Sequence, residues 1–294
     1  MEGVDIRNPE EDLVKRSARD LVSSSYAIAL TGAGISTESG IPDFRGPNGI
    51  WTKHPEAERQ AYEAYDKLLR DPKAHWEEIL SPGSFSSFFD EVGKALPNPG
   101  HYALADLERM GILKLTITQN VDELHQKAGS RNVIEYHGGL SKLRCMSCGS
   151  RFGRDESDLE RLKKENQLPP RCRKCNGVLK HDGVYFTEPI PRDVYQQSLE
   201  AAWKCDLMLI CGTSAVIYPF ASLPTTARAK KTEKERQTET GLFVVEEIPA
   251  VIIIEVNAEP TPLTQGRISD YLIQGRTGEV LPRIVDEVKQ LEKA

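Results

Sequence analysis

The chain has 294 residues, of which 39% are hydrophobic and 28% charged, with a formal net charge of −6. This composition supports a folded protein of one or two domains and argues against disorder and against a nucleic-acid partner. The longest aliphatic run, 250–254, is much shorter than a membrane span, and the acidic N-terminus lacks a secretory signal. We therefore expect an intracellular, cytoplasmic protein without a membrane partner.

Hydrophobic periodicity divides the chain into alternating helices and strands. In chain order, the expected elements are a helix at 10–24, a strand at 25–30, a helix at 101–110, strands at 113–118, 133–136 and 183–186, a helix at 192–203, strands at 206–211, 250–256 and 270–273, and a helix at 279–292. The run at 250–256 is the richest in β-branched residues and predicts a central strand. The alternation predicts an α/β fold with a mostly parallel, doubly wound sheet, which the family resemblance described below identifies as Rossmann-like.

Two segments interrupt this alternation. Residues 46–96 are aromatic and interrupted by prolines, which predicts a module of short helices, and residues 141–182 carry four cysteines in a charged background. We expect both to form a smaller lobe, a helical module and a zinc-binding module. The large domain would then comprise 1–45, 97–140 and 183–294. The charged stretch 229–240 predicts a mobile, solvated loop.

The cysteines predict a metal site rather than disulfides, because the chain lacks an export signal. Four of the six form two CxxC pairs separated by 23 residues: Cys145, Cys148, Cys172 and Cys175. Four thiolates complete one tetrahedral site, for which Zn²⁺ is the default ion, and leave no position for water. We therefore expect one structural Zn²⁺. The other two, Cys205 and Cys211, flank an apolar strand and are expected to be inert core residues.

A glycine-rich turn follows the first predicted strand. Residues 30–40 read LTGAGISTESG, with Ser36 and Thr37 as potential helix caps. Glycines let the backbone approach a ligand, and a helix start offers N–H groups to phosphate. Thr37 stands at the third glycine position of GxGxxG, and no acidic residue follows at the expected ribose position. The turn by itself therefore leaves a nucleotide site and an ordinary tight turn both open.

Short polar strings follow the other predicted strands, namely TQNVD at 118–122, HG at 137–138, GTS at 212–214 and Asn257. In open α/β sheets, ligands bind beyond the carboxyl ends of the strands, so these strings and the glycine turn would meet in one crevice. His137 is the candidate general base, since the pKa of histidine is about 6.5 and allows proton transfer near neutral pH. A structural histidine is the alternative.

These motifs, together with GAGIS at 32–36, GIPDFRG at 40–46 and the two CxxC pairs, occur in the order found in sirtuins. Over residues 13–290 the chain resembles this family of NAD-dependent protein-lysine deacylases. The resemblance implies that NAD and an acyl-lysine protein or peptide bind between a large Rossmann-type domain and the small lobe. Chromatin proteins are among the partners that it suggests.

The resemblance also implies residue roles. His137 would be the catalytic base, and Asn120 and Asp122 would hold the nicotinamide end of NAD. Phe44 would shield the reactive ribose from water. The full expected NAD-binding set is Gly32, Ala33, Gly34, Ser36, Thr37, Asp43, Phe44, Arg45, Gln119, Asn120, Asp122, His137, Gly212, Thr213, Ser214, Asn257 and Thr277. The expected peptide-binding residues are Gly183, Val184, Phe186 and Val216.

In the implied reaction, the acyl oxygen attacks the anomeric carbon of the ribose as nicotinamide leaves, giving an imidate. His137 deprotonates a ribose hydroxyl, which attacks that imidate. Water then releases lysine and O-acyl-ADP-ribose. Zinc takes no part in this scheme. Two other functions stay open: mono-ADP-ribosyl transfer to protein on the same fold, and NAD sensing by a non-catalytic zinc protein.

The chain departs from the sirtuin pattern in the peptide-binding segment. Gly183 stands where a β-branched residue is usual, and Thr187 stands where a glycine is usual. Either change would alter the acyl chains accepted or be silent. The region after Trp76 lacks the Tyr-x-x-Arg pair with which some sirtuins hold acidic acyl groups, so a neutral group such as acetyl is expected.

Overall fold

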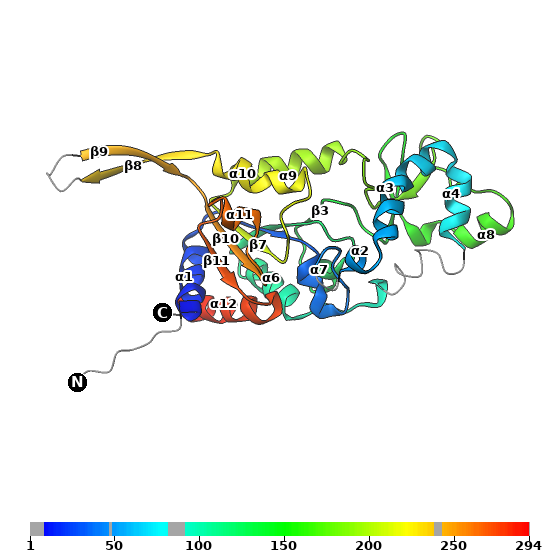
Figure 1. Ribbon diagram of the computed structural model, residues 1–294. Coiled ribbons are helices and arrows are strands. Elements are labelled where there is room, and N and C mark those ends of the chain that lie inside the picture. Colours follow the sequence, from blue (N-terminus) through cyan, green and yellow to red (C-terminus); the bar gives the residue numbers. More distant parts are fainter. Residues whose placement is uncertain (1–8, 47–48, 82–91, 238–242, 294) are drawn as a thin grey trace.

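The computed structural model describes residues 9–46, 49–81, 92–237 and 243–293 (Figure 1). A six-stranded parallel sheet has the strand order β11-β10-β7-β1-β2-β3. Its strands are β1 (Ala27–Thr31), β2 (Leu113–Thr118), β3 (Val133–Glu135), β7 (Leu207–Cys211), β10 (Ile252–Asn257) and β11 (Tyr271–Gln274). The chain winds from β1 first to one side and then to the other. The predicted doubly wound fold is therefore confirmed, and the order reverses between β1 and β7.

Helices cover both faces of this sheet (Figure 1). Alternate residues of a strand point to opposite faces. Ala27 and Ala29 of β1 accordingly pack in one apolar core, and Ile28 and Leu30 pack in the other. The first core contains α1 (Pro9–Ser23), α6 (Pro99–Arg109) and α12 (Thr277–Leu291); the second contains α9 (Arg192–Lys204) and α10 (Leu223–Arg228). Burial on both faces explains why β1 and β7 are almost wholly apolar.

The smaller lobe combines the two interrupting segments, as expected. An antiparallel sheet contains β4 (Lys142–Cys145), β5 (Arg151–Gly153) and β6 (Leu179–His181). Between β5 and β6 the chain forms η2 (Arg154–Glu156) and α8 (Leu159–Lys164). The helical part contains α2 (Ile50–Lys53), α3 (Pro55–Arg70) and α4 (Pro72–Ile79). The parts share a core around Trp76, whose Nε1 donates a 2.9 Å hydrogen bond to the carbonyl of Leu179. The exact domain boundaries remain a prediction.

Shorter elements connect these layers. They are η1 (Ala33–Ser39), α7 (Leu124–Lys127), η3 (Phe220–Ser222) and α11 (Pro262–Gln265). Within the described part of the chain, helices of the length and apolar character required to cross a membrane are absent.

Two expectations about elements need correction. Residues 183–186 form no strand, because the chain turns there after β6 and its backbone groups bond to His137 and Glu188. The segment predicted as a loop at 229–240 contributes β8 (Lys231–Gln237), which pairs antiparallel with β9 (Phe243–Pro249). Residues 238–240 of that segment lie outside the described residues. This ribbon extends away from the sheet (Figure 1). The strand predicted to be central is confirmed as β10, an interior strand paired with β11 and β7.

Candidate active site and metal centre

The carboxyl ends of β1 and β7 interlock through glycines. Gly34 N donates to Gly212 O at 2.7 Å, and a Cβ on Gly34 would lie only 2.7 Å from that oxygen. A Cβ on Gly212 would lie 2.2 Å from Ile35 N, and its φ of +59° is in the left-handed region that favours glycine. A Cβ on Gly32 would meet Thr213 at 2.7 Å. The glycines therefore bring two loops together, in addition to any approach to a ligand.

The expected capping roles of Ser36 and Thr37 are wrong. The 3₁₀ helix η1 begins already at Ala33, directly after Gly32, because the GAG turn leads straight into it. The hydroxyl of Thr37 donates to Gly34 O at 2.9 Å. The Ser36 hydroxyl instead forms hydrogen bonds with the polar string that follows β2.

Ser36, Asn120 and Asp122 form one buried hydrogen-bond network. Ser36 Oγ donates to Asp122 Oδ2 at 2.7 Å, and Asn120 Nδ2 donates to Ser36 Oγ at 3.0 Å and to Gly32 O at 3.1 Å. Burial raises the pKa of Asp122, although hydrogen bonds from Leu124 N and Ser36 act in the opposite direction. The network joins the ends of β1 and β2 and fixes the orientation of both predicted nicotinamide-binding residues.

His137 follows β3 and is held by the end of β2. Its Nδ1 lies 3.2 Å from the carbonyl oxygen of Gln119. A carbonyl can only accept, so this contact assigns the proton to Nδ1 and leaves the Nε2 lone pair free. Burial lowers the pKa of His137 to about 4, partly offset by the Gln119 hydrogen bond. The ring is therefore neutral at pH 7 and able to accept a proton at Nε2.

The ends of β2, β7 and β10 are joined by a second set of contacts. Gln119 Nε2 donates to Thr213 Oγ1 at 2.8 Å, and Thr213 N donates to Asn257 Oδ1 at 3.0 Å. Asn257 Nδ2 and Thr277 Oγ1 are buried, and within the described residues neither has a hydrogen-bond partner. Buried polar atoms are normally paired, so these two atoms fit contacts to the polar groups of a dinucleotide.

Some predicted residues lie apart from this network. The segment Asp43–Arg45 contacts the helical module. The centroid of the Phe44 ring lies 4.9 Å from that of the Trp51 ring, and the Arg45 guanidinium lies 4.4 Å from the Trp51 ring centroid. Trp51 also contacts Phe186, at 5.3 Å between ring centroids. Among the remaining residues, Ala33 is half-buried, whereas Ser214 and Val216 are exposed.

The segment predicted to bind the peptide lies directly against the predicted base. Val184 N donates to His137 O at 2.8 Å. A Cβ on Gly183 would meet nothing closer than that same oxygen, at 4.0 Å, so the position has room for the usual β-branched residue. Thr187 has a φ of +67°, the left-handed conformation in which glycine is usual. The second departure therefore places a β-branched residue in strained backbone, and the first leaves space beside His137.

The four predicted metal ligands are brought together in the small lobe. The sulfurs of Cys145, Cys148, Cys172 and Cys175 all lie within 4.8 Å of one another, and all four cysteines are free thiols. Backbone N–H groups of Ser147 and Lys174 point at the sulfurs of Cys145 and Cys172, both at 3.4 Å. This donor set fits a tetrathiolate zinc site. Cys205 and Cys211 are fully buried in the large domain, as expected.

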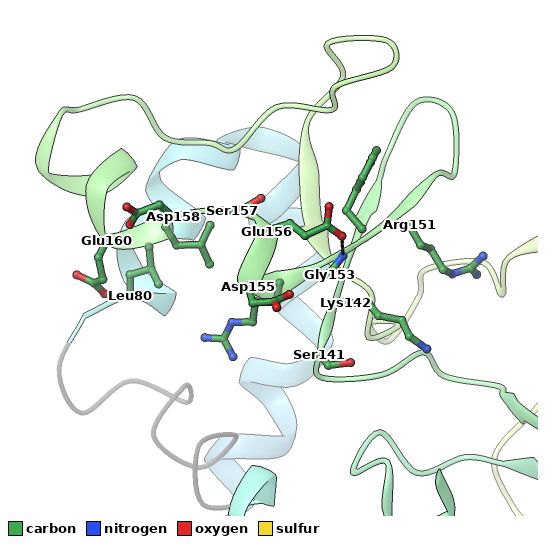
Figure 2. Close-up of a pocket in the computed structure, with 13 residues that line it drawn as sticks. Leu80, Ser141, Lys142, Arg151, Gly153, Asp155, Glu156, Ser157, Asp158 and Glu160 are labelled. Atoms are coloured by element: carbon green, nitrogen blue, oxygen red, sulfur yellow. Dashed lines mark hydrogen bonds between the residues drawn. The ribbon is translucent and has the colours of Figure 1, made fainter. Parts of the chain in front are cut away.

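A cavity of about 870 Å³ lies on the zinc-binding module, away from these strand ends. Figure 2 shows its lining, which comes mainly from β5, η2 and the start of α8, with Glu156 accepting a hydrogen bond from Gly153 N. Both basic and acidic side chains line it, including Arg151, Asp155 and Asp158. It contains none of the residues predicted to bind NAD, peptide or zinc.

Two buried histidines next to the site escaped the sequence analysis. His125 Nε2 lies 2.9 Å from Thr31 Oγ1, and the ring of His101 lies 5.0 Å from that of His125. Asn98 N donates to His101 Nδ1 at 3.3 Å, within the cap of α6. The only signal in the sequence was the position of His101 at a helix start. Burial lowers the pKa of His101 to about 4 and that of His125 to about 3.

These histidines make the fold sensitive to acid. Below pH about 6.5 the unfolded chain binds protons that the folded protein does not accept until about pH 4. The free energy of unfolding should therefore have its full value above pH 6.5. It should fall as the pH decreases, by up to about 1.4 kcal/mol per pH unit for each buried histidine. Urea unfolding between pH 7 and 4.5 measures this slope. His101→Gln should reduce this slope by up to about 1.4 kcal/mol per pH unit, because the other buried histidines still contribute, whereas replacing the exposed His54 should leave the slope unchanged. Equal slopes in all three proteins would contradict the assignment.

Comparisons with known proteins agree with this arrangement. The model of the Sir2 family matches residues 32–219. NAD-dependent protein deacylase 2 of Pyrobaculum aerophilum is 42% identical over 92% of this chain and 94% of its own length. A solved Sir2 homologue–NAD complex is 36% identical, with a TM-score of 0.70 and 94% of each chain covered. The structure of Sir2Af2 bound to a myristoylated histone peptide is also 36% identical, with a TM-score of 0.65, and covers 96% of this chain and 99% of its own.

Proposed function

The chain belongs to the Sir2 family, and we propose that it removes acyl groups from protein lysines in a reaction that consumes NAD. The observation that carries this proposal is the set of hydrogen bonds that joins the polar strings after β1, β2, β3, β7 and β10 at one edge of the sheet. That edge holds a neutral imidazole, a buried carboxyl group and two buried polar atoms that have no hydrogen-bond partner among the residues that the structure describes.

This geometry supports the proposed roles of the individual residues. When bound, NAD supplies a high-energy nicotinamide–ribose bond, and cleavage of that bond activates the acyl group for transfer. Asn120 and Asp122 hold the nicotinamide end beside the glycine junction of Gly32, Gly34 and Gly212. His137 accepts a proton from a ribose hydroxyl at Nε2, because its Nδ1 is engaged by Gln119.

The two ends of the cofactor would be held by different elements. Asn257 and Thr277 bind the ADP half, and Phe44 excludes water from the ribose. The remaining residues of the expected NAD-binding set contact NAD at the same site. Gly183, Val184, Phe186 and Val216 bind the acyl-lysine segment of the substrate, and the acyl group is neutral, such as acetyl.

The zinc site has a structural role in this proposal. Its four thiolates fill the coordination of Zn²⁺, and Cys145 and Cys172 belong to the apolar core of the small lobe. Four reduced, paired thiols also suit a reducing compartment, which supports a cytoplasmic location. Histones and other chromatin proteins are candidate substrates, since the related Sir2Af2 was solved with a histone peptide.

The products of one reaction test the proposed function. The protein, NAD and an acetyl-lysine peptide are incubated and analysed by mass spectrometry. Deacylation should yield nicotinamide and O-acetyl-ADP-ribose in equal amounts, together with the free lysine peptide. A peptide that gains ADP-ribose would instead indicate mono-ADP-ribosyl transfer, and binding of NAD without any product would indicate a non-catalytic sensor.

A further inference from the structure

A buried lysine lies beneath the peptide-binding segment. Lys180, on β6, has a side chain only 2% exposed. Its Nζ donates to the carbonyls of His181 at 2.8 Å and Gly183 at 2.7 Å, and it lies 3.0 Å from Glu188 Oε2. These three acceptors match the three N–H bonds of an ammonium group. Burial of a charged side chain is costly, and a complete set of partners for a buried lysine therefore indicates a specific role.

One peptide group connects this lysine to the predicted base. The carbonyl of Gly183 accepts from Lys180, and the N–H of the same peptide bond, on Val184, donates to His137 O at 2.8 Å. An ammonium on the carbonyl polarises the peptide group and strengthens the bond that its N–H donates. The plane of the peptide is therefore fixed from both sides, with Lys180 on one and His137 on the other.

The surroundings hold Lys180 itself in place. Glu188 Oε2 also accepts from Tyr185 N at 2.9 Å, and Glu188 Oε1 accepts from Arg144 at 3.0 Å. Arg144 binds Asp182 as well, through an Nε–Oδ1 contact of 2.9 Å. The resulting cluster of charges spans β4, β6 and residues 182–188. It links the zinc-binding module to the segment that contacts the base.

We propose that Lys180 is a positioning residue for His137, acting through the Gly183–Val184 peptide group. The inference rests on the proposed function, because it concerns the step in which His137 accepts a proton. Without the ammonium, the Gly183 carbonyl loses its partner, the peptide plane is free to rotate, and the backbone of His137 loses its support. The step that needs the base then slows, while the earlier loss of nicotinamide, which needs no base, continues.

Lys180→Met tests this at nearly constant side-chain length. Because the single variant leaves the Glu188 carboxylate buried without its lysine, the double variant Lys180→Met/Glu188→Gln is made as well. Each is assayed for deacylation and for exchange of labelled nicotinamide into NAD, at saturating peptide. Deacylation should fall about 10- to 100-fold in both, as expected for a small misplacement of a catalytic group, while nicotinamide exchange stays within about threefold of wild type. Lys142→Met, a more exposed lysine of the same module, should leave both rates unchanged.

A second measurement requires no turnover. In the protein without ligands, hydrogen exchange of the Val184 amide should be at least about tenfold faster in both Lys180 variants than in wild type or Lys142→Met, because its bond to His137 weakens. Unchanged exchange at Val184, unchanged deacylation, or an equal fall in deacylation and nicotinamide exchange would each overturn the inference. If wild type itself makes no deacylated peptide, the proposed function fails, and the Val184 measurement still decides whether Lys180 holds this peptide group.

Discussion

Replacing His137 by alanine should reduce deacylation of an acetyl-lysine peptide by about 10²- to 10⁴-fold, the usual contribution of a general base. The reason is structural: Nδ1 is committed to the Gln119 carbonyl, so Nε2 is the atom able to take the proton. The neutral state needed for this is secured by burial, which lowers the pKa of the ring to about 4. Steady-state rates of peptide deacylation by wild type and variant measure the effect.

A measurement of NAD affinity distinguishes loss of the catalytic base from loss of the folded site in His137→Ala. Within the described parts of the chain, the polar contact of the His137 side chain is with Gln119 O, so its removal should leave the affinity for NAD within a few-fold, as measured by calorimetry. His54→Ala, at an exposed histidine of the small lobe, is the matched control and should keep full activity. If His137→Ala turned over peptide at the wild-type rate, the base would have to be another group.

Cys172→Ser should release the metal and unfold the zinc-binding module. Binding of structural Zn²⁺ contributes on the order of 10 kcal/mol in isolated zinc modules, and a serine hydroxyl is a poor substitute for a thiolate. Cys172 is also buried in the small-lobe core with Trp76 and Leu179, so the loss should spread to the helical module. Metal analysis should fall from one zinc per chain to near zero, with a large decrease in thermal stability.

Cys205→Ser is the control for this experiment, because Cys205 is equally buried but lies in the large domain. It should lose some stability yet retain one zinc per chain. A soluble, metal-free and fully active Cys172→Ser protein would contradict the structural role of the metal.

Local sequence patterns predicted the large domain well because its strands are buried on both faces. Residues 207–211 are wholly apolar, residues 250–256 contain Glu255 as their one polar residue, and each run is followed by the polar residues that mark the carboxyl ends of the strands. The family model and the relatives confirm the resemblance, and the sulfur cluster matches the CxxC spacing. The individual roles of the NAD- and peptide-binding residues remain proposals.

The errors arose where distant residues decide the local structure. Residues 183–186 are apolar enough for a strand, but Lys180, Glu188 and His137 take their backbone groups. Nothing adjacent in sequence signals the burial of Lys180. The charge of 229–240 predicted a solvated loop, whereas pairing with 243–249 makes part of it a strand.

The β8–β9 ribbon has a practical consequence for work on this protein. The chain leaves and re-enters the large domain at adjacent points, joined by the bond from Ala250 N to Lys230 O. Those points lie at the amino end of β10. The strand then runs about 17 Å to Asn257 at its carboxyl end, where the candidate active site lies. The ribbon is thus a natural place to attach a fluorophore or an immobilisation tag, because cargo carried there stays clear of incoming substrates.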